Sequence, residues 1–79
     1  MNQQDILDVI VNHAREVVPE LETHDFQPTD SLRSLGANSV DRADIIMMTL
    51  ESLSLSIPLN ELASAANIGE LAGLIHAKA

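Results

Sequence analysis

The chain has 79 residues and a net charge of −8, because four Lys and Arg stand against twelve Asp and Glu. This length suits one small domain, residues 1–79, and leaves no room for a second domain or a deep enzyme cleft. The negative charge repels phosphate backbones, so we expect no nucleic-acid partner. The chain has no cysteine, which excludes disulfides, Cys-ligated metals and catalysis by a cysteine thiol.

The composition predicts an all-α fold. Hydrophobic residues make up 46% of the chain but Phe26 is the single aromatic residue, so the core has to be built from aliphatic side chains and Met. Such a core favours packed helices over sheets. No apolar run approaches membrane-spanning length, and the first residues lack the basic and apolar regions of a signal peptide. We therefore expect a cytoplasmic protein, monomeric by default, without a membrane partner.

The chain opens with a predicted helix and a long loop. Residues 3–18 carry apolar side chains at helical spacing with polar ones between them, which is typical of an amphipathic helix. Pro19 lacks a backbone donor and ends that pattern. The stretch to Asn38 predicts a loop that holds a short helical turn near residues 31–35. Four isolated apolar residues should pin this loop to the core: Leu21, Phe26, Leu32 and Leu35.

Three more helices are predicted after the loop. Asn38 is a good N-cap, so a second helix should begin at Ser39 and run to about residue 53. Pro58 then favours a short third helix over residues 59–66. Asn67, followed three residues later by Glu70, resembles a capping box and predicts the start of a last helix. The predicted fold is a small four-helix bundle, with three longer helices, a short third helix and a long loop between the first two.

The helical spacing also predicts the core. We expect Phe26 to close the long loop onto one cluster of aliphatic side chains. Because so small a core has little spare volume, we expect a shallow pocket or none. Eight side chains should be buried together: Ile6, Ile10, Val17, Ile46, Leu50, Ile68, Leu71 and Ile75.

The segment that carries chemistry is Gly-Ala-Asn-Ser-Val-Asp at residues 36–41, a glycine-containing loop that delivers Ser39 to the first turn of a helix. The unpaired amides and the positive end of the helix dipole would stabilise a phosphate ester on that serine oxygen. Alone, this spacing is weak evidence, because a serine in the first turn of a helix is commonly no more than a polar residue.

The motif and the order of the elements resemble those of the acyl carrier protein family, whose pattern is Gly-x-Asp-Ser-Leu-Asp followed by an acidic residue three positions later. In this chain Asn38 replaces the aspartate before the serine, and Asp44 takes the acidic position. The resemblance covers the whole chain. It implies that a phosphopantetheinyl transferase attaches 4'-phosphopantetheine from coenzyme A to Ser39. The protein would then hold acyl groups as thioesters and would be a carrier, not an enzyme.

Residues 38–45 also resemble one subgroup, the discrete donor carriers of β-branching cassettes in bacterial polyketide biosynthesis. This resemblance implies three further partners. An acyltransferase loads malonyl, a decarboxylating ketosynthase turns it into acetyl, and a 3-hydroxy-3-methylglutaryl (HMG) synthase-like enzyme takes the acetyl. Acceptor carriers of these systems bear a tryptophan on the second helix, and this chain has none, with Ile45 at the corresponding position.

The second helix is the predicted docking surface. At about 100° per residue, its acidic residues share one side with Met48, Ile45 lies beside them, and the core stripe falls opposite. The resemblance favours a partner-binding face over an ordinary solvated one. Arg42 either pairs within the helix or contacts an acidic residue of a partner. The predicted partner-binding residues are Asp41, Arg42, Asp44, Ile45, Met48 and Glu51.

Two other functions are compatible with the same sequence features. One is a generic fatty-acid or polyketide extender carrier, and the other is an unmodified acidic helical module that binds a basic partner without a cofactor. We expect no metal site, because the three histidines lie far apart and in no ligand spacing. We also expect no catalytic residues, because nothing places a base or an oxyanion hole beside a serine.

Overall fold

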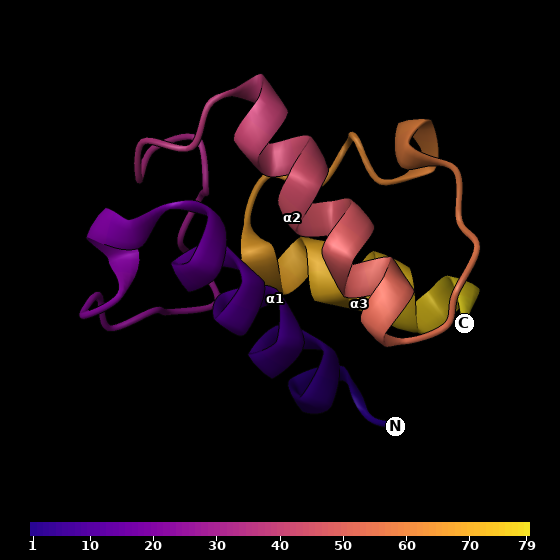
Figure 1. Cartoon of the computed structure of the whole chain (residues 1–79). Coiled ribbons are helices and arrows are strands. Elements are labelled where there is room, and N and C mark those ends of the chain that lie inside the picture. Colours follow the sequence, from indigo (N-terminus) through magenta and orange to yellow (C-terminus); the bar gives the residue numbers. More distant parts are fainter.

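The computed structural model describes residues 1–79 and confirms the all-α class. It contains no strand. In Figure 1 the long loop that follows the first helix returns to the start of the second. The elements in chain order are α1 (Gln3–Val17), the 3₁₀ turn η1 (Pro19–Leu21), α2 (Ser39–Ser52), the 3₁₀ turn η2 (Leu59–Glu61) and α3 (Ile68–Lys78).

Helix α1 is the central element of the packing. It begins at a capping box, in which the Asn2 side chain accepts from the Asp5 amide at 2.8 Å and the Asp5 carboxylate accepts from the Asn2 amide at 3.2 Å. The backbone of α1 comes close to those of both α2 and α3, whereas the backbones of α2 and α3 stay farther from each other. The two later helices are therefore held together mainly through α1. None of the helices is long and apolar enough to cross a membrane.

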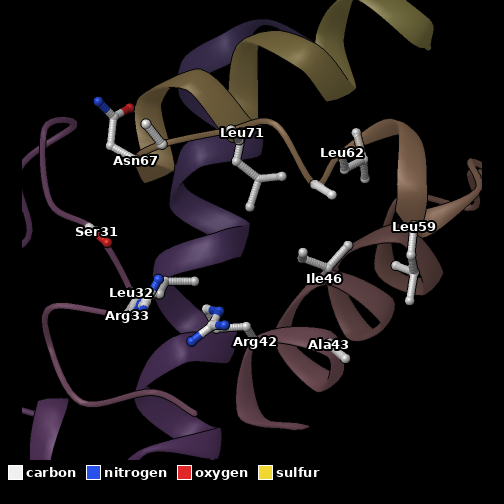
Figure 2. A pocket seen from close by; sticks show the side chains of 13 residues that line it. Ser31, Leu32, Arg33, Arg42, Ala43, Ile46, Leu59, Leu62, Asn67 and Leu71 are labelled. Carbon is white, nitrogen blue, oxygen red and sulfur yellow. The ribbon is translucent and has the colours of Figure 1, made fainter. Parts of the chain in front are cut away.

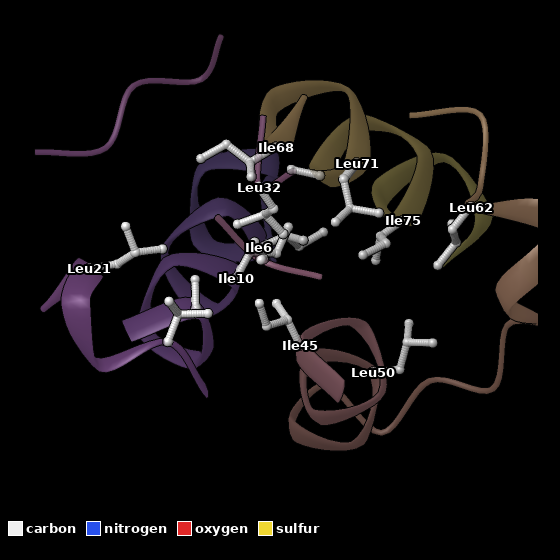
Figure 3. Packing of buried hydrophobic residues seen from close by; sticks show 14 residues of the cluster. Ile6, Ile10, Leu21, Leu32, Ile45, Leu50, Leu62, Ile68, Leu71 and Ile75 are labelled. Atoms are coloured by element: carbon white, nitrogen blue, oxygen red, sulfur yellow. The ribbon is translucent and has the colours of Figure 1, made fainter. Parts of the chain in front are cut away.

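The core draws on all three helices and on the loops (Figure 3). Six of the eight predicted core residues are buried, but Val17 and Ile46 are only half-buried. Val18 and Ile45 are buried instead, one residue from the predicted Val17 and Ile46, whereas Leu50 on α2 is buried as predicted. The four predicted loop anchors do pack on the core, two of them buried and two half-buried: Leu21, Leu32, Phe26 and Leu35.

The predicted third helix over residues 59–66 is wrong in extent. Only Leu59–Glu61 forms a 3₁₀ turn, and irregular turns follow it to Asn67. Leu62 is the one buried side chain in this segment, and the small Ala63, Ala65 and Ala66 give a helix no apolar face to pack. The bundle therefore has three α-helices and an irregular segment in the fourth position.

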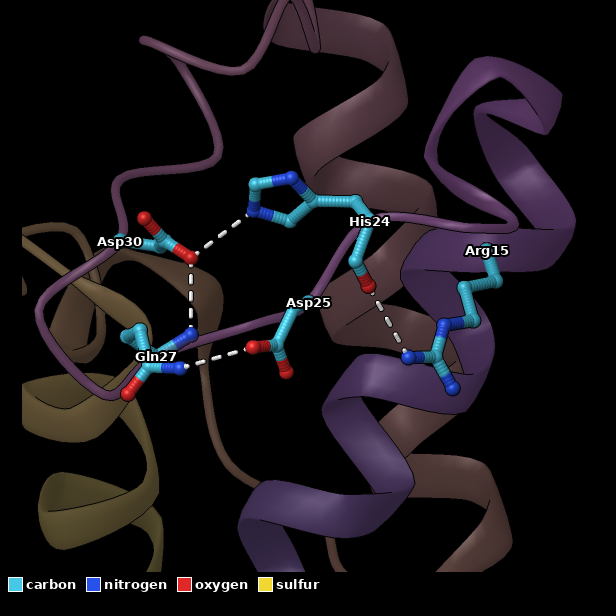
Figure 4. A network of polar contacts seen from close by, with 5 residues as sticks. All are labelled: Arg15, His24, Asp25, Gln27 and Asp30. Atoms are coloured by element: carbon cyan, nitrogen blue, oxygen red, sulfur yellow. Dashed lines mark hydrogen bonds and ion pairs between the residues drawn. The ribbon is translucent and has the colours of Figure 1, made fainter.

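A polar network holds the long loop together (Figure 4), and two backbone hydrogen bonds tie this loop to the start of α3. The Asp30 carboxylate accepts from the Gln27 amide at 2.8 Å and lies 3.0 Å from His24 Nε2. The carbonyls of Pro28 and Asp30 in turn accept from the first two amides of α3, at 2.8 and 2.9 Å. These contacts satisfy helix donors that have no intrahelical acceptor. The loop is thus an integral part of the packed structure.

Candidate functional site

One helical turn leads into the predicted site and fixes its position. The Leu35 amide donates to the Ser31 carbonyl at 3.0 Å, which confirms the turn expected near residues 31–35. Gly36 then adopts φ +103°, a left-handed value that favours glycine. The Gly36 amide donates to the Arg33 carbonyl at 3.2 Å, and the Ala37 amide donates to the Leu32 carbonyl at 3.0 Å. This pattern closes a helical turn. The chain therefore enters α2 from a defined direction.

Ser39 is the first residue of α2, and the cap before it leaves it accessible. The Asn38 side chain accepts from the Asp41 amide at 2.8 Å, and the Asp41 carboxylate accepts from the Asn38 amide at 3.2 Å. The capping box satisfies the amides of Asn38 and Asp41, whereas the amides of Ser39 and Val40 have no intrahelical acceptor. Ser39 itself is exposed. A phosphate ester on its oxygen would lie beside unpaired donors and the positive end of the helix.

An exposed stripe of alternating apolar and acidic residues runs along α2 from Ser39. Val40 and Met47 are 68% and 55% exposed, and Asp44 and Glu51 lie exposed between and beyond them. Spacings of four, three and four residues place all four on one side of the helix. We call Val40, Asp44, Met47 and Glu51 the α2 stripe. The sequence predicted its two acids and missed its two apolar members.

Ile45 is a correction to the predicted surface. It is 0% exposed and lies in the core, so it presents no surface to a partner (Figure 3). Thr49, one turn later, is equally buried. Its hydroxyl donates to the Ile45 carbonyl at 2.8 Å, so this polar group is satisfied without water. Asp41 and Met48 are half-buried, at the border of the exposed side. The outward side of α2 is therefore rotated from the predicted one.

Arg42 is engaged within the chain. Its Nη1 donates to the Ala37 carbonyl at 2.8 Å, and the side chain is half-buried. This contact ties the first turn of α2 to the turn that precedes Ser39. Arg42 was expected either to pair within the helix or to contact an acidic residue of a partner. The structure shows a contact within the chain, made to the backbone of the residue before the N-cap.

A hollow of about 560 Å³ lies beside this turn, between α2, the start of α3, residues 59–66 and the loop at residues 31–33 (Figure 2). The hollow is open to solvent and is not an enclosed cavity, so the expectation of a shallow pocket is not contradicted. The hollow lies where the backbones of α2 and α3 are farther apart than either is from α1, and the alanines of the irregular segment are too small to fill the gap. Apolar contributions come from Ile46, Leu62 and Leu71.

Comparison with known proteins decides what this arrangement is. The family model described as "Phosphopantetheine attachment site" matches residues 8–75. The chain belongs to this family. It is also 53% identical over 78 residues to the polyketide biosynthesis acyl-carrier-protein AcpK of Bacillus subtilis (strain 168), covering 99% of this chain and 95% of the relative. The predicted family is confirmed, and the protein is an acyl carrier that uses phosphopantetheine, not an enzyme.

A solved structure matches this carrier along nearly its whole length. It is a chain in the crystal structure of the curacin biosynthetic pathway HMG synthase in complex with acetyl donor-ACP, with a TM-score of 0.93 and 55% sequence identity. The match covers 98% of this carrier and 99% of that chain. Because a 79-residue carrier spans that chain almost completely, the matched chain is the small donor-ACP of the complex.

Proposed function

We propose that this carrier bears 4'-phosphopantetheine on Ser39 and donates acetyl to an HMG-synthase-like enzyme in polyketide β-branching. The observation that supports the donor role best is 55% identity, along almost the whole chain, to an acetyl donor-ACP in complex with an HMG synthase. The prosthetic group would supply the terminal thiol that a cysteine-free chain lacks. The chain's own residues would then position that group and select the enzymes that reach it.

The surroundings of Ser39 fit a phosphate ester. The serine is exposed at the first position of α2, beside two amides without intrahelical acceptors. At Gly36 no heavy atom lies within 4 Å of the position that a Cβ would take, so the loop next to the serine is open. Asn38 maintains the cap without adding a negative charge beside the phosphate. These features support Ser39 as the attachment residue.

The α2 stripe is the proposed docking surface. It begins at the residue after Ser39, so an enzyme that reaches the prosthetic group has to cover it. Val40 and Met47 offer apolar contact, and Asp44 and Glu51 offer negative charge, which suits a partner with an apolar patch bordered by cations. The net charge of −8 should accelerate encounter with any such partner, and close contacts should discriminate between them.

The remaining partners belong to the same proposal. A phosphopantetheinyl transferase would modify Ser39, an acyltransferase would deliver malonyl, and a decarboxylating ketosynthase would convert it to acetyl. Each would meet the same exposed start of α2, because that is where the attachment residue lies. We propose that the carrier works as a monomer in the cytoplasm.

Acetyl transfer from the loaded carrier tests the donor role and its surface together. Met47→Glu places a charge in the exposed apolar part of the stripe and should lower transfer to the HMG-synthase-like enzyme about five- to tenfold. Asn12→Asp adds the same charge on the exposed side of α1 and should transfer like the parent. Transfer is measured at two salt concentrations, with the rate of Ser39 modification recorded for each variant.

Two results would contradict the proposal at different points. If the modified parent protein transfers no acetyl to the synthase-like enzyme, the donor role is wrong and a generic carrier is left. If Met47→Glu transfers as well as the parent, the donor role stands but the enzyme docks elsewhere than the α2 stripe.

A further inference from the structure

The hollow beside α2 differs in charge from the rest of the molecule. Its lining includes Arg33 and Arg42, and no Asp, Glu or Lys. The lining therefore carries +2, whereas the remaining residues carry −10, since the whole chain carries −8. In a protein with twelve acidic residues, an apolar hollow bordered only by cations is suited to an anion.

These two arginines have no carboxylate partner. The other two cations of the chain are engaged: Lys78 pairs with Glu61 at 2.9 Å, and Arg15 donates to the His24 carbonyl and lies over the Phe26 ring. Neither Arg33 nor Arg42 takes part in an ion pair. Arg42 uses one of its five N–H groups on Ala37, which leaves others for a ligand.

One of the two arginines lies about one helical turn from the proposed attachment residue. Arg42 follows Ser39 by three residues, about one helical turn, and Ile46 lies about one turn further along the same helix. Figure 2 shows the Arg42 side chain directed toward the loop at residues 31–33, whereas Ile46 and Leu71 lie away from that loop, on α2 and α3. Arg42 is thus the lining residue of α2 nearest in the chain to Ser39, and the apolar Ile46 lies farther along the helix.

We propose that this hollow binds a short acyl group that ends in a carboxylate, of the malonyl type, carried on the Ser39 prosthetic group. Arg33 and Arg42 pair with the carboxylate, and Ile46, Leu62 and Leu71 surround the acyl chain. A guanidinium presents a fork of donors that matches a carboxylate. The inference rests on the proposed function, because it needs Ser39 to be the attachment residue.

It follows that the hollow binds the acyl group more tightly before decarboxylation, as malonyl, than after it, as acetyl. A partner enzyme exchanges the carboxylate for a proton and releases carbon dioxide, so acetyl no longer offers the arginines an anion. The acetyl thioester is then free to leave the hollow, whereas the malonyl thioester is retained. The chain thereby favours presentation of acetyl to the next enzyme.

The test is cleavage of the loaded thioester by hydroxylamine, which needs no partner enzyme after loading. The carrier is loaded with malonyl, acetyl or butyryl phosphopantetheine from the corresponding coenzyme A thioester, and loss of the acyl group is followed by intact mass. Arg33→Gln/Arg42→Gln should lose the malonyl group roughly two- to fivefold faster than the parent, because a partly exposed ion pair contributes a modest free energy. Acetyl and butyryl should be lost equally fast from both proteins.

Controls separate the carboxylate from other causes. Lys78→Gln removes one positive charge outside the hollow, as Arg33→Gln does within it, and should not change malonyl loss. Arg33 is exposed, so the single variant Arg33→Gln should fold normally and show a smaller acceleration in the same direction. In the parent protein, the Ile46 methyl resonances should shift between the malonyl and acetyl forms.

The contradicting outcomes are distinct. Equal malonyl loss from parent and double variant would overturn the inference while leaving the proposed function intact. Equal acceleration for all three acyl groups would also overturn it, since the arginines would then act on the phosphate or on the fold rather than on the carboxylate. Failure to load Ser39 at all would overturn the proposed function and this inference with it.

Discussion

Ile45 and Met47 lie two residues apart on α2 and have opposite environments. Ile45 is 0% exposed and Met47 is 55% exposed, because two residues advance a helix by about 200°. Sequence alone does not distinguish them, since residues 45–48 are four apolar side chains in a row. The difference determines which residue stabilises the fold and which is available to a partner.

Truncating each residue should separate these roles. Ile45→Ala should lower the free energy of unfolding by about 2–5 kcal/mol, because it leaves a cavity in the core. Met47→Ala should change it by no more than about 0.5 kcal/mol, because its side chain is mostly in water. Urea unfolding measures both, and similar losses for the two variants would show that the phase of α2 is wrong.

Asp30 is the residue whose ionisation the structure perturbs. The hydrogen bond from the Gln27 amide, and then the one with His24, hold the pKa of its carboxyl below the ordinary value of 3.8. A depressed folded-state pKa contributes stability that is present above the unfolded pKa and is lost as the pH falls through the folded pKa. Because this carboxylate closes the turn whose Pro28 and Asp30 carbonyls accept from the first amides of α3, the loss should be felt beyond the loop itself.

Replacing Asp30 tests that linkage. Asp30→Asn should reduce the free energy of unfolding at neutral pH and should flatten its decline below about pH 4. Asp25→Asn, a change at an exposed neighbour in the same loop, should keep the decline of the parent. The measurement is urea unfolding over a series of pH values, and parallel curves for Asp30→Asn and the parent would contradict the account.

At the scale of elements, the sequence predicts helix starts better than it predicts helix faces. Asn2, Asn38 and Asn67 each cap a helix through a side-chain oxygen. The cap at Asn38 was predicted from the residue type, and the cap at Asn67 from its spacing to Glu70. The buried face of α2 was not predictable, because a run of apolar residues has no helical period and because Thr49 is buried on a local hydrogen bond.

The two glycines of α3 give a prediction about how this helix is seated. A Cβ at Gly69 would come within 2.8 Å of the Pro28 carbonyl, which is backbone, whereas at Gly73 it would meet the flexible end of Gln3 at 3.3 Å. Gly69→Ala should therefore destabilise the protein by forcing the loop off α3. Gly73→Ala should stabilise it by up to about 1 kcal/mol, because alanine is the better helix former.

Thermal unfolding of the two variants measures this contrast. Both substitutions are the same chemical change in the same helix, so each serves as the control for the other. Shifts of the melting temperature in the same direction would contradict the close packing of the loop at residues 28–30 against the start of α3.

At the scale of the molecule, the arrangement of three helices explains both surfaces of the carrier. Helix α1 packs against α2 and α3, so the outward side of α2 stays free and a hollow remains between α2 and α3. The order of elements, the charge and the serine motif were enough to predict the family. The hollow was not predictable, because it depends on residues 59–66 failing to form a packed helix.

The central claim is that Ser39 carries the prosthetic group, and intact mass after incubation with coenzyme A and a broad-specificity phosphopantetheinyl transferase tests it most directly. The parent protein should gain the mass of one phosphopantetheinyl group, and Ser31→Ala, a loss of a hydroxyl in the preceding turn, should gain it as well. Ser39→Ala should gain nothing while keeping the circular dichroism of the parent, because Ser39 is exposed. No gain by the parent protein, or an undiminished gain by Ser39→Ala, would contradict the account.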